Sequence, residues 1–363
     1  MKKNKNYVDL KDQPVPEGQH LLEVDDLKMY FHTEDGVVRA VDGVSYTLDR
    51  GETLGVVGES GSGKSVTAMT IMGLISMPPG KIEGGDVRYR GRSILEMTEE
   101  EMQHIRGNDI AMIFQDPMTS LNPVYKIGKQ VGEGLRLHRG YSKQEALKRA
   151  TELLDLVGIP EPEKRVNEYP HQFSGGMRQR VMIAMALACD PDLLIPDEPT
   201  TALDVTIQAQ IIELMQEMQE KNGNAIIMIT HDLGVVADMA DKIMVMYAGR
   251  PVEFGTAEEI FYESRHPYTW GLIRSIPEQA IDEKKPLTPI HGNPPSLMNL
   301  PEGCVFSPRC PYATDKCRKQ RPERVVTESG HYSACHYSGD PEFLKNAPET
   351  SRTRMDSKKG GEA

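Results

Sequence analysis

One eight-residue segment constrains the fold of this chain most strongly. Residues 58–65 read GESGSGKS, directly after the apolar segment TLGVVG (53–58) and directly before a segment with helical periodicity (65–75). Its three glycines allow the backbone to curl so that successive N–H groups point at phosphate oxygens. The pattern G-x-x-x-x-G-K-[ST] between a strand and a helix is typical of a phosphate-binding loop. It predicts an α/β fold that binds a nucleotide where the strand ends.

The loop also predicts which residues hold the phosphates. Lys64 can reach the β- and γ-phosphates, and the Ser65 hydroxyl can ligate Mg²⁺. The positive end of the following helix adds to this cradle. The expected nucleotide contacts in this segment are Gly58, Ser60, Gly61, Ser62, Gly63, Lys64, Ser65 and Val66. A glycine turn without a ligand is the alternative, and the complete pattern in its proper context disfavours it.

Two acidic residues end a second apolar segment, LLIPDE (193–198). We expect Asp197 to bind Mg²⁺ beside the phosphate loop, and Glu198 to orient or deprotonate the attacking water. Taken alone, the pair could equally be solvated acids of a turn, but the phosphate loop upstream favours the catalytic interpretation. Pro196 removes one backbone N–H from this strand, so we expect a local irregularity that could weaken hydrolysis.

Apolar strands alternate with helical segments as far as residue 265. The expected strands are 37–48, 53–58, 109–115, 192–198, 225–231 and 242–249, and the expected helices are 65–75, 143–158, 176–189 and 206–223. Such alternation is typical of an α/β sheet. Of the 25 prolines, 12 fall in residues 266–363, so the character of the chain changes near residue 265.

Composition limits where such a chain can act. The longest unbroken apolar run, residues 181–189, is about half of the ~18 residues that span a bilayer. The lysine-rich N-terminus has no apolar stretch of a secretory signal. We therefore expect a cytoplasmic protein that does not enter the membrane by itself. The formal net charge of −12 argues against a general nucleic-acid-binding protein, since neutralising phosphates requires a basic face.

A second glycine-rich segment, FSGGMRQR (173–180), precedes a long helical segment. Ser174, Gly175 and Gly176 form another anion-binding helix N-terminus, for which a simple small-molecule kinase has no use. At this point the sequence resembles the ATP-binding subunits of ABC transporters, in which SGG is the signature motif. By the same resemblance, Gln115 in IFQDP is the Q-loop, Asp204 in TALD is the D-loop, and His231 in ITHD is the switch histidine.

The resemblance implies roles for residues that composition alone would not single out. Glu198 and His231 would be catalytic, and adenine would stack on Phe31, with Tyr30 as the alternative. The cofactors would be ATP and Mg²⁺. The Mg²⁺ ligands would be Ser65, Gln115 and Asp197. The signature departs from the common LSGGQ at Phe173 and Met177, which leaves the contacts of these two positions open.

The resemblance also implies an architecture. The fold would be a P-loop α/β domain of the ABC type, residues 20–265, with a RecA-like mixed sheet and a helical subdomain at about 116–180. Two such subunits would face head to tail, so that the signature of one closes the ATP site of the other. One copy of each motif means that this chain cannot complete a site alone.

The tail narrows the resemblance. HPYTWGLIRSIP (266–277) and GCVFSPRCPYATDKC (303–317) resemble the C-terminal extension of the oligopeptide/dipeptide/nickel importers. The extension would span 266–338, and residues 1–19 and 340–363 would be flexible. The implied function is to power peptide import at the cytoplasmic face of the membrane. The implied partners are a second, non-identical ATP-binding subunit, two permease subunits and an extracellular peptide-binding protein.

Three other functions stay open at this stage. The chain could serve an importer of nickel or another small solute, because the ATP-binding half does not touch the cargo. It could be a soluble ABC ATPase of DNA repair or translation, although such proteins usually fuse two ATPase domains or insert long coiled coils. A P-loop small-molecule kinase is disfavoured by the signature and by the D-loop.

Four of the five cysteines cluster near the C-terminus, and they are Cys304, Cys310, Cys317 and Cys335. In a reducing compartment such a cluster indicates a metal site more often than disulfides. The spacing C-x5-C-x6-C-x17-C is neither that of a zinc finger nor that of a ferredoxin. Some members of the resembling group are thought to hold an iron–sulfur cluster here, so we favour [4Fe–4S] over zinc, with reduced cysteines without metal as the third interpretation. Cys189 ends an apolar helical segment and is expected in the core.

Overall fold

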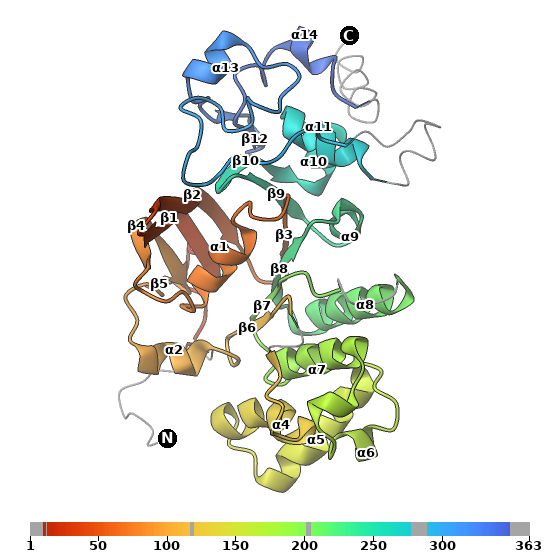
Figure 1. Ribbon diagram of the computed structural model, residues 1–363. Helices are drawn as coiled ribbons and strands as arrows, with labels where there is room; N and C mark the ends of the chain where they lie inside the picture. Colours follow the sequence, from red (N-terminus) through yellow and green to blue (C-terminus); the bar gives the residue numbers. More distant parts are fainter. Residues whose placement is uncertain (1–9, 12, 117–119, 201–204, 277–288, 349–363) are drawn as a thin grey trace.

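A mixed eight-stranded sheet forms the centre of the computed structural model, which describes residues 10–11, 13–116, 120–200, 205–276 and 289–348. The sheet runs through the middle of the molecule in Figure 1, in the order β11-β12-β10-β9-β3-β8-β7-β6. Its strands are β3 (Thr53–Val57), β6 (Ile110–Ile113), β7 (Leu193–Pro196), β8 (Ala225–Thr230), β9 (Lys242–Tyr247), β10 (Arg250–Thr256), β11 (Val325–Val326) and β12 (Tyr332–Ser333). The strands from β6 to β9 pair in parallel, and β10, β12 and β11 pair antiparallel. The predicted α/β fold with a mixed sheet is therefore confirmed.

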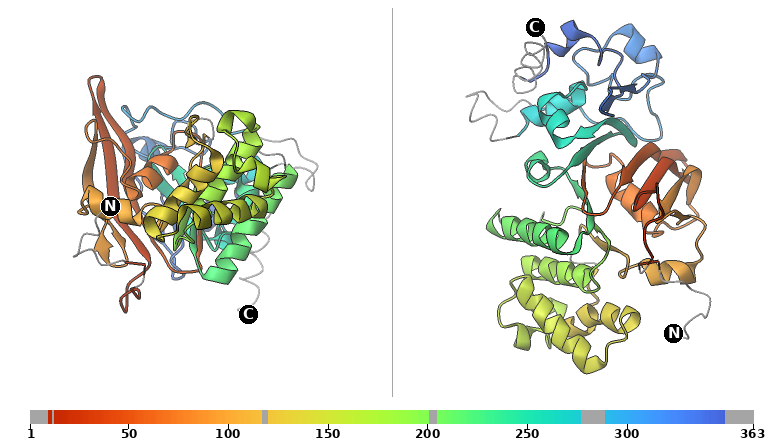
Figure 2. Two further views of the ribbon diagram at one scale, coloured as in Figure 1. Left: turned by 90° about the horizontal axis from the view of Figure 1, so that it is seen from below. Right: turned by 180° about the vertical axis from the view of Figure 1, so that it is seen from behind.

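A second, four-stranded antiparallel sheet was largely missed by the sequence analysis. Its order is β2-β1-β4-β5, and its strands are β1 (Leu22–Thr33), β2 (Gly36–Leu48), β4 (Gly80–Tyr89) and β5 (Arg92–Ser93). Only β2 was predicted, because shifts of register interrupt the alternation of apolar residues along β1 where it pairs with β2 and β4. This sheet shares a core with α1 (Lys64–Ile71) and one face of the central sheet. Figure 2 shows it along one side of the molecule.

Both faces of the central sheet are covered, as its continuous apolar strands predict. In β8, Ile227 and Ile229 belong to the core shared with the antiparallel sheet. Ile226 and Met228 belong instead to the core shared with the helical part of the molecule. Successive side chains of a strand point to opposite faces, so one uninterrupted apolar run supplies both layers.

The helices divide into two groups. The helical part, at the lower end of Figure 1, comprises α4 (Ile127–His138), α5 (Lys143–Leu156), α6 (Pro162–Arg165) and α7 (Gly175–Leu187). Outside this part, the described residues of the ATP-binding portion form α1, α2 (Glu99–Ile105), α8 (Val205–Asn222) and α9 (Leu233–Ala237). A capping box begins α5, because the Ser142 hydroxyl accepts from Glu145 N and the Glu145 carboxylate accepts from Ser142 N. Such a box satisfies two otherwise unpaired N–H groups. Cys189, just after α7, is buried as expected.

The pairing of β7 with β8 is interrupted at Pro196, as the missing N–H of this proline predicts. β7 pairs with β8 at Leu193 and Leu194, and pairing resumes only as an isolated bridge between Asp197 and Ile229. The register is the same on both sides of the gap, since each β7 residue faces the β8 residue 32 positions later. The irregularity is therefore a local loss of pairing and not a slip of the strand.

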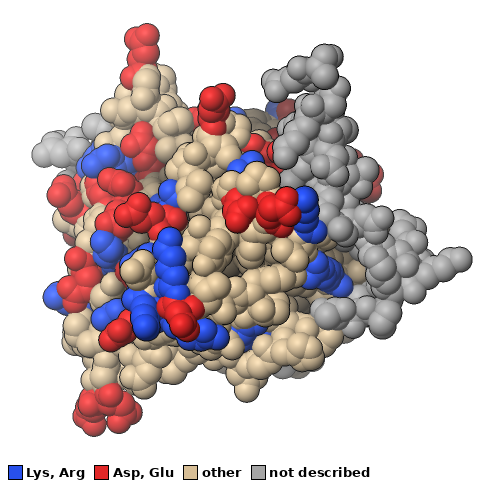
Figure 3. Space-filling view, turned by 90° about the horizontal axis from the view of Figure 1, so that it is seen from above, with Lys and Arg blue, Asp and Glu red and all other residues tan. Residues whose placement is uncertain are grey.

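The C-terminal extension is built onto the central sheet. β12 pairs with β10, and β11 pairs with β12, so the extension lengthens the sheet at one edge. Its helices are α10 (Ala257–Tyr262), α11 (Pro267–Arg274), α13 (Asp315–Lys319) and α14 (Pro341–Leu344). Its own Tyr268 and Phe306 share a core with Val57 and Tyr247 of the central strands. Acidic and basic side chains are interspersed on the face of this end of the molecule that Figure 3 shows.

Two segments expected to be flexible are partly packed. Leu10 is buried in the core that the two sheets share. Asp340 caps α14, and Ala347 is only 1% exposed. The expected flexible segments 1–19 and 340–363 are therefore too long at their inner ends, while residues 1–9, 12 and 349–363 lie outside the described part. Within the described residues, no helix combines the length and apolarity needed to cross a membrane.

Candidate nucleotide-binding site

The phosphate loop joins β3 to α1, and two of its glycines allow close packing against neighbouring strands. At Gly63, φ is 102°, and a Cβ atom would lie 2.3 Å from the backbone oxygen of Ala40. At Gly58, φ is 151°, and a Cβ atom would lie 2.2 Å from the backbone oxygen of Met246. Neither position has room for a side chain, so the loop is fixed against β2 and β9.

Lys64 and Ser62 fit the groups of a bound phosphate. The Lys64 ammonium donates to the carbonyl oxygens of Gly58 (2.6 Å) and Glu59 (3.0 Å). Burial lowers the pKa of Lys64, although three neighbouring carboxylates act in the opposite direction. The Ser62 hydroxyl is buried and has no hydrogen-bond partner in the described part of the chain. A buried cation and an unsatisfied donor within a curled backbone suit phosphate oxygens.

Two of the three predicted Mg²⁺ ligands, Ser65 and Asp197, meet across two elements, whereas the third, Gln115, binds Glu198. Ser65 Oγ, at the start of α1, donates to Asp197 Oδ1, just after β7, at 3.0 Å. Burial raises the pKa of Asp197, and the charge of Glu198 adds to the effect. A buried carboxylate next to a second carboxylate is stabilised by a cation. A hydroxyl and a carboxylate oxygen are also ligands that Mg²⁺ accepts.

Glu198 lies at the centre of the predicted catalytic residues. Its Oε2 accepts from Gln115 Nε2 at 2.8 Å, and its Oε1 lies 3.3 Å from His231 Nδ1. Its backbone has φ of 48°, a conformation that non-glycine residues seldom adopt and that recurs at functional sites. The structure thus brings together the acid, the Q-loop glutamine and the switch histidine that the sequence predicted from three separate strand ends.

The signature residues lie elsewhere in the molecule. Ser174 caps α7 by accepting from Met177 N, and α7 belongs to the helical part (Figure 1). Ser174 and Gly175 are exposed, and a Cβ atom on Gly175 would meet nothing within 4 Å. The N-terminus of α7 is therefore open to an external anion. The D-loop residue Asp204 lies outside the described residues.

Of the two candidates for the adenine-stacking aromatic, Tyr30 is engaged elsewhere. Its hydroxyl donates to Asp42 Oδ1 at 2.9 Å, and Asp42 also pairs with Arg250 at 2.7 Å. Phe31, the next residue of β1, is half-buried and lies opposite Val38 in the ladder. This favours Phe31, whose role in stacking stays a prediction.

The four C-terminal cysteines share one cavity. Cys304, Cys310, Cys317 and Cys335 all line a space of about 20 Å³, which is the size of one water or small ion. All four are free thiols. Within the described residues, however, no three His, Cys, Asp or Glu side chains are already arranged to hold a metal ion. The thiols are thus neighbours without the geometry of a formed metal site.

An apolar groove of about 300 Å³ lies beside the Q-loop. It was not predicted from the sequence. Its walls come from the end of α1, from β6 and the segment after it, and from α7, and they include Leu74, Phe114 and Met185. Leu74 and Phe114 are each 40% exposed, so the groove presents apolar surface next to Gln115.

Two contacts to the phosphate loop come from the C-terminal extension and were not predicted. The Glu59 N–H donates to Tyr268 Oη at 2.8 Å, and Arg309 binds the Glu59 carboxylate. The sequence marked the HPY and SPRC segments only as family features. A contact between residues this distant in sequence leaves no local pattern that could reveal it.

Comparison with known proteins gives two family matches. Residues 41–201 match the family described as ABC transporter, and residues 252–317 match the C-terminal region of oligopeptide/dipeptide transporters. The oligopeptide transport ATP-binding protein OppD of Bacillus subtilis (strain 168) is 58% identical over 312 residues, which are 86% of this chain and 87% of that protein. The dipeptide transport ATP-binding protein DppD of Escherichia coli (strain K12) is 52% identical over 320 residues, 88% and 97% of the two chains.

Solved structures share the fold. The ATP-binding cassette MJ0796, a dimer in a post-hydrolysis state with ADP and phosphate, has a TM-score of 0.60 and 28% identity, and it covers 65% of this chain and 98% of its own. The cbiO1 protein of Clostridium perfringens, part of the transporter complex cbiONQ, has a TM-score of 0.56 and 29% identity, covering 67% and 91%.

Proposed function

The chain belongs to the ABC transporter family, and from this premise we propose that it binds and hydrolyses ATP to power the import of oligopeptides or dipeptides through a membrane permease. One observation carries the proposal. Lys64, Ser65 and Asp197 meet beside a second group, Glu198 with Gln115 and His231, at the ends of neighbouring parallel strands. The peptide cargo is supported by the names of the relatives and by the match of residues 252–317.

The geometry suggests a role for each residue in hydrolysis. The phosphate loop and Lys64 bind the phosphates. Glu198, held by Gln115 and next to His231, orients the attacking water and accepts its proton. Ser65, Asp197 and Gln115 would hold Mg²⁺, which when bound neutralises charge on the phosphate oxygens.

The site would be completed by a second subunit. Ser174 and Gly175 are exposed at the N-terminus of α7, far along the chain from the phosphate loop. Facing the ATP of a partner, this helix end would donate N–H groups to the γ-phosphate. ATP would then close the pair and hydrolysis would reopen it. Following the family resemblance, we take the partner to be a second, non-identical ATP-binding subunit.

The apolar groove beside the Q-loop suits the membrane partner. It exposes Leu74 and Phe114 next to Gln115, which contacts Glu198. A permease segment seated there would sense the state of the catalytic carboxylate through one glutamine. We therefore place the chain at the cytoplasmic face of the membrane, on two permease subunits that receive peptide from an extracellular binding protein.

We further propose that the four-cysteine cavity holds a metal centre, which is a [4Fe–4S] cluster if the family resemblance holds and a zinc ion as the alternative. The shared cavity of the four thiols supports a common ligand. Its small volume would accept a single ion more readily than a cluster, which would require the cavity to widen. Brown colour with broad absorbance near about 400 nm in anaerobically purified protein indicates the cluster, and colourless protein with stoichiometric zinc contradicts it.

Co-purification from membranes tests the transport assignment. A tagged chain expressed at its native level should bring down a membrane permease and a second ATP-binding subunit. A groove variant, Phe114→Glu, should lose the permease while still binding nucleotide. The matched control is Val326→Glu, at an exposed position of β11 outside the groove walls. Recovery of the intact chain alone, or with soluble repair or translation proteins, would contradict the proposal. A co-purified binding protein that takes nickel instead of peptide would correct the cargo.

A further inference from the structure

We propose that Arg309 and Tyr268 of the C-terminal extension are positioning residues for the nucleotide, because together they hold Glu59 of the phosphate loop. This inference rests on the function proposed above and assigns to the extension a part in nucleotide binding. Neither residue would touch the nucleotide itself. They would act through Glu59.

Arg309 holds the Glu59 side chain with two parallel hydrogen bonds. Its Nη1 lies 2.5 Å from Glu59 Oε2, and its Nη2 lies 2.9 Å from Glu59 Oε1. The Arg309 side chain is only 4% exposed and that of Glu59 is 30% exposed. A two-pronged contact of this kind fixes orientation as well as distance, and a partly desolvated pair is worth more than a surface one.

The guanidinium of Arg309 is itself held rigidly. Besides Glu59, it donates to the carbonyl oxygens of His291 (3.0 Å) and Ile290 (3.1 Å) and to the hydroxyl of Tyr247 (3.3 Å). These contacts use all five of its N–H groups. Arg309 is therefore a fixed support that joins the extension, β9 and the phosphate loop.

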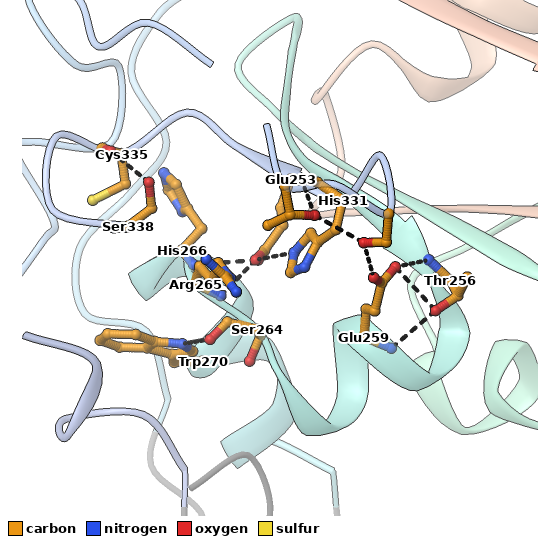
Figure 4. Close-up of polar contacts among 12 residues, drawn as sticks. Glu253, Thr256, Glu259, Ser264, Arg265, His266, Trp270, His331, Cys335 and Ser338 are labelled. Atoms are coloured by element: carbon orange, nitrogen blue, oxygen red, sulfur yellow. Dashed lines mark hydrogen bonds and ion pairs between the residues drawn. The ribbon is translucent and has the colours of Figure 1, made fainter. Parts of the chain in front are cut away.

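Tyr268 holds the backbone of the same loop residue. Its buried hydroxyl accepts from Glu59 N at 2.8 Å. The start of α11, which carries Tyr268, is anchored by the buried carboxylate of Glu253, which accepts from the N–H groups of Arg265 (2.5 Å) and His266 (3.3 Å). Figure 4 shows this carboxylate between those residues and His331. Glu59 is thus held by its amide and its carboxylate at once.

The held residue supports the group that binds phosphate. The Glu59 carbonyl accepts from the Lys64 ammonium at 3.0 Å and from Ser62 N at 3.2 Å. A shift of Glu59 would move one of the two carbonyl supports of Lys64 and the turn that ends at Ser62. The energetic link between extension and nucleotide therefore runs from Arg309 through Glu59 to Lys64.

Titration calorimetry of the full chain with Mg²⁺–ADP tests this link. Arg309→Met should weaken binding about tenfold or more, because a two-pronged charged contact is lost. The affinity of Arg309→Lys should lie between those of the unmodified chain and of Arg309→Met, since lysine keeps the positive charge but cannot form two parallel hydrogen bonds. Glu59→Gln should also weaken the binding of Mg²⁺–ADP. The double variant with Arg309→Met should bind only slightly more weakly than Glu59→Gln alone, because both changes remove the same contact. Arg324→Met is the control, since Arg324 binds the carbonyl of Gly43 instead of the phosphate loop.

The outcomes separate this inference from the proposed function. If the unmodified chain does not bind Mg²⁺–ADP, the proposed function fails. If it binds, and Arg309→Met lowers the melting temperature without changing affinity, Arg309 is only structural and the inference is overturned. Additive effects of the two substitutions would overturn it as well. Should Arg309→Met fail to fold, Arg309→Lys and Glu59→Gln carry the same test.

Discussion

Glu198 is held in an unusual way for a carboxylate at the end of a strand. Its side chain is 12% exposed, and it lies between Gln115 and His231. Its positive φ of 48° costs conformational energy that the surroundings must offset. Strain combined with two polar partners fits a residue held for chemistry, whereas a solvated turn would need neither.

Replacing this carboxylate should separate binding from hydrolysis. In Glu198→Gln the amide cannot accept a proton from water, so we expect ATP hydrolysis to fall by about 100-fold or more while Mg²⁺–ATP still binds. Steady-state phosphate release and nucleotide titration measure the two quantities. Glu100→Gln, on the exposed side of α2, is the control. Hydrolysis at the unmodified rate would remove Glu198 from the catalytic role.

The cysteine cavity makes a second prediction for single residues. Burial raises the pKa of Cys310 to about 11 and that of Cys335 to about 12. Both thiols are therefore protonated at neutral pH, and metal ligation, which requires thiolates, must release their protons. Calorimetric titration of the metal-free chain with zinc, in two buffers of different ionisation heat, should show the release of at least these two protons. Zinc should also bind more tightly at higher pH. Binding without proton release would show that these thiols are not ligands.

At the scale of elements, β7 connects two features that the sequence predicted together. Pro196 pairs with Ile113 of β6, but the ladder to β8 has a gap before Asp197. The loss of pairing is confined to the two residues before the acids, because Asp197 bridges Ile229 and Glu198 N donates to the Ile229 carbonyl at 2.9 Å. The missing pair just before Asp197 leaves the segment that carries the two acids with one backbone hydrogen bond fewer to β8.

Restoring the missing N–H should restore that support. Pro196→Ala can donate to the neighbouring strand, so we expect faster ATP hydrolysis with little change in nucleotide affinity. Steady-state rates of ATP hydrolysis by the unmodified chain and by Pro196→Ala, measured at saturating Mg²⁺–ATP, test this prediction. An unchanged rate would mean that the gap beside Pro196 has no catalytic consequence.

The features that could be predicted from this sequence follow local patterns, and those that could not depend on contacts between distant parts of the chain. Lys64, Asp197 and His231 could be placed together because each follows a parallel strand, and the ends of parallel strands meet at one edge. The antiparallel sheet was missed because irregular register breaks the pattern along β1. The pairing of Glu59 with Arg309 could not be predicted, because only the folded extension brings the two together.

At the scale of the whole molecule, the extension and the ATP-binding portion are one structure. β12 extends the central sheet, and Phe306 shares a core with Val57, the last residue of the strand that leads into the phosphate loop. The boundary near residue 265 is therefore a change of composition and not a flexible joint. Under the function proposed above, the signature of a second subunit would complete the ATP site, and the groove beside Gln115 would bind the permease.

Uptake of a labelled oligopeptide into vesicles that contain the whole importer tests the central claim most directly. With the unmodified chain, the account predicts accumulation of the peptide that depends on ATP and on the binding protein. With Glu198→Gln in the same complex, accumulation should fall to the level seen without ATP. Equal accumulation with the two chains, or a complex that hydrolyses ATP and moves no peptide, would contradict the account.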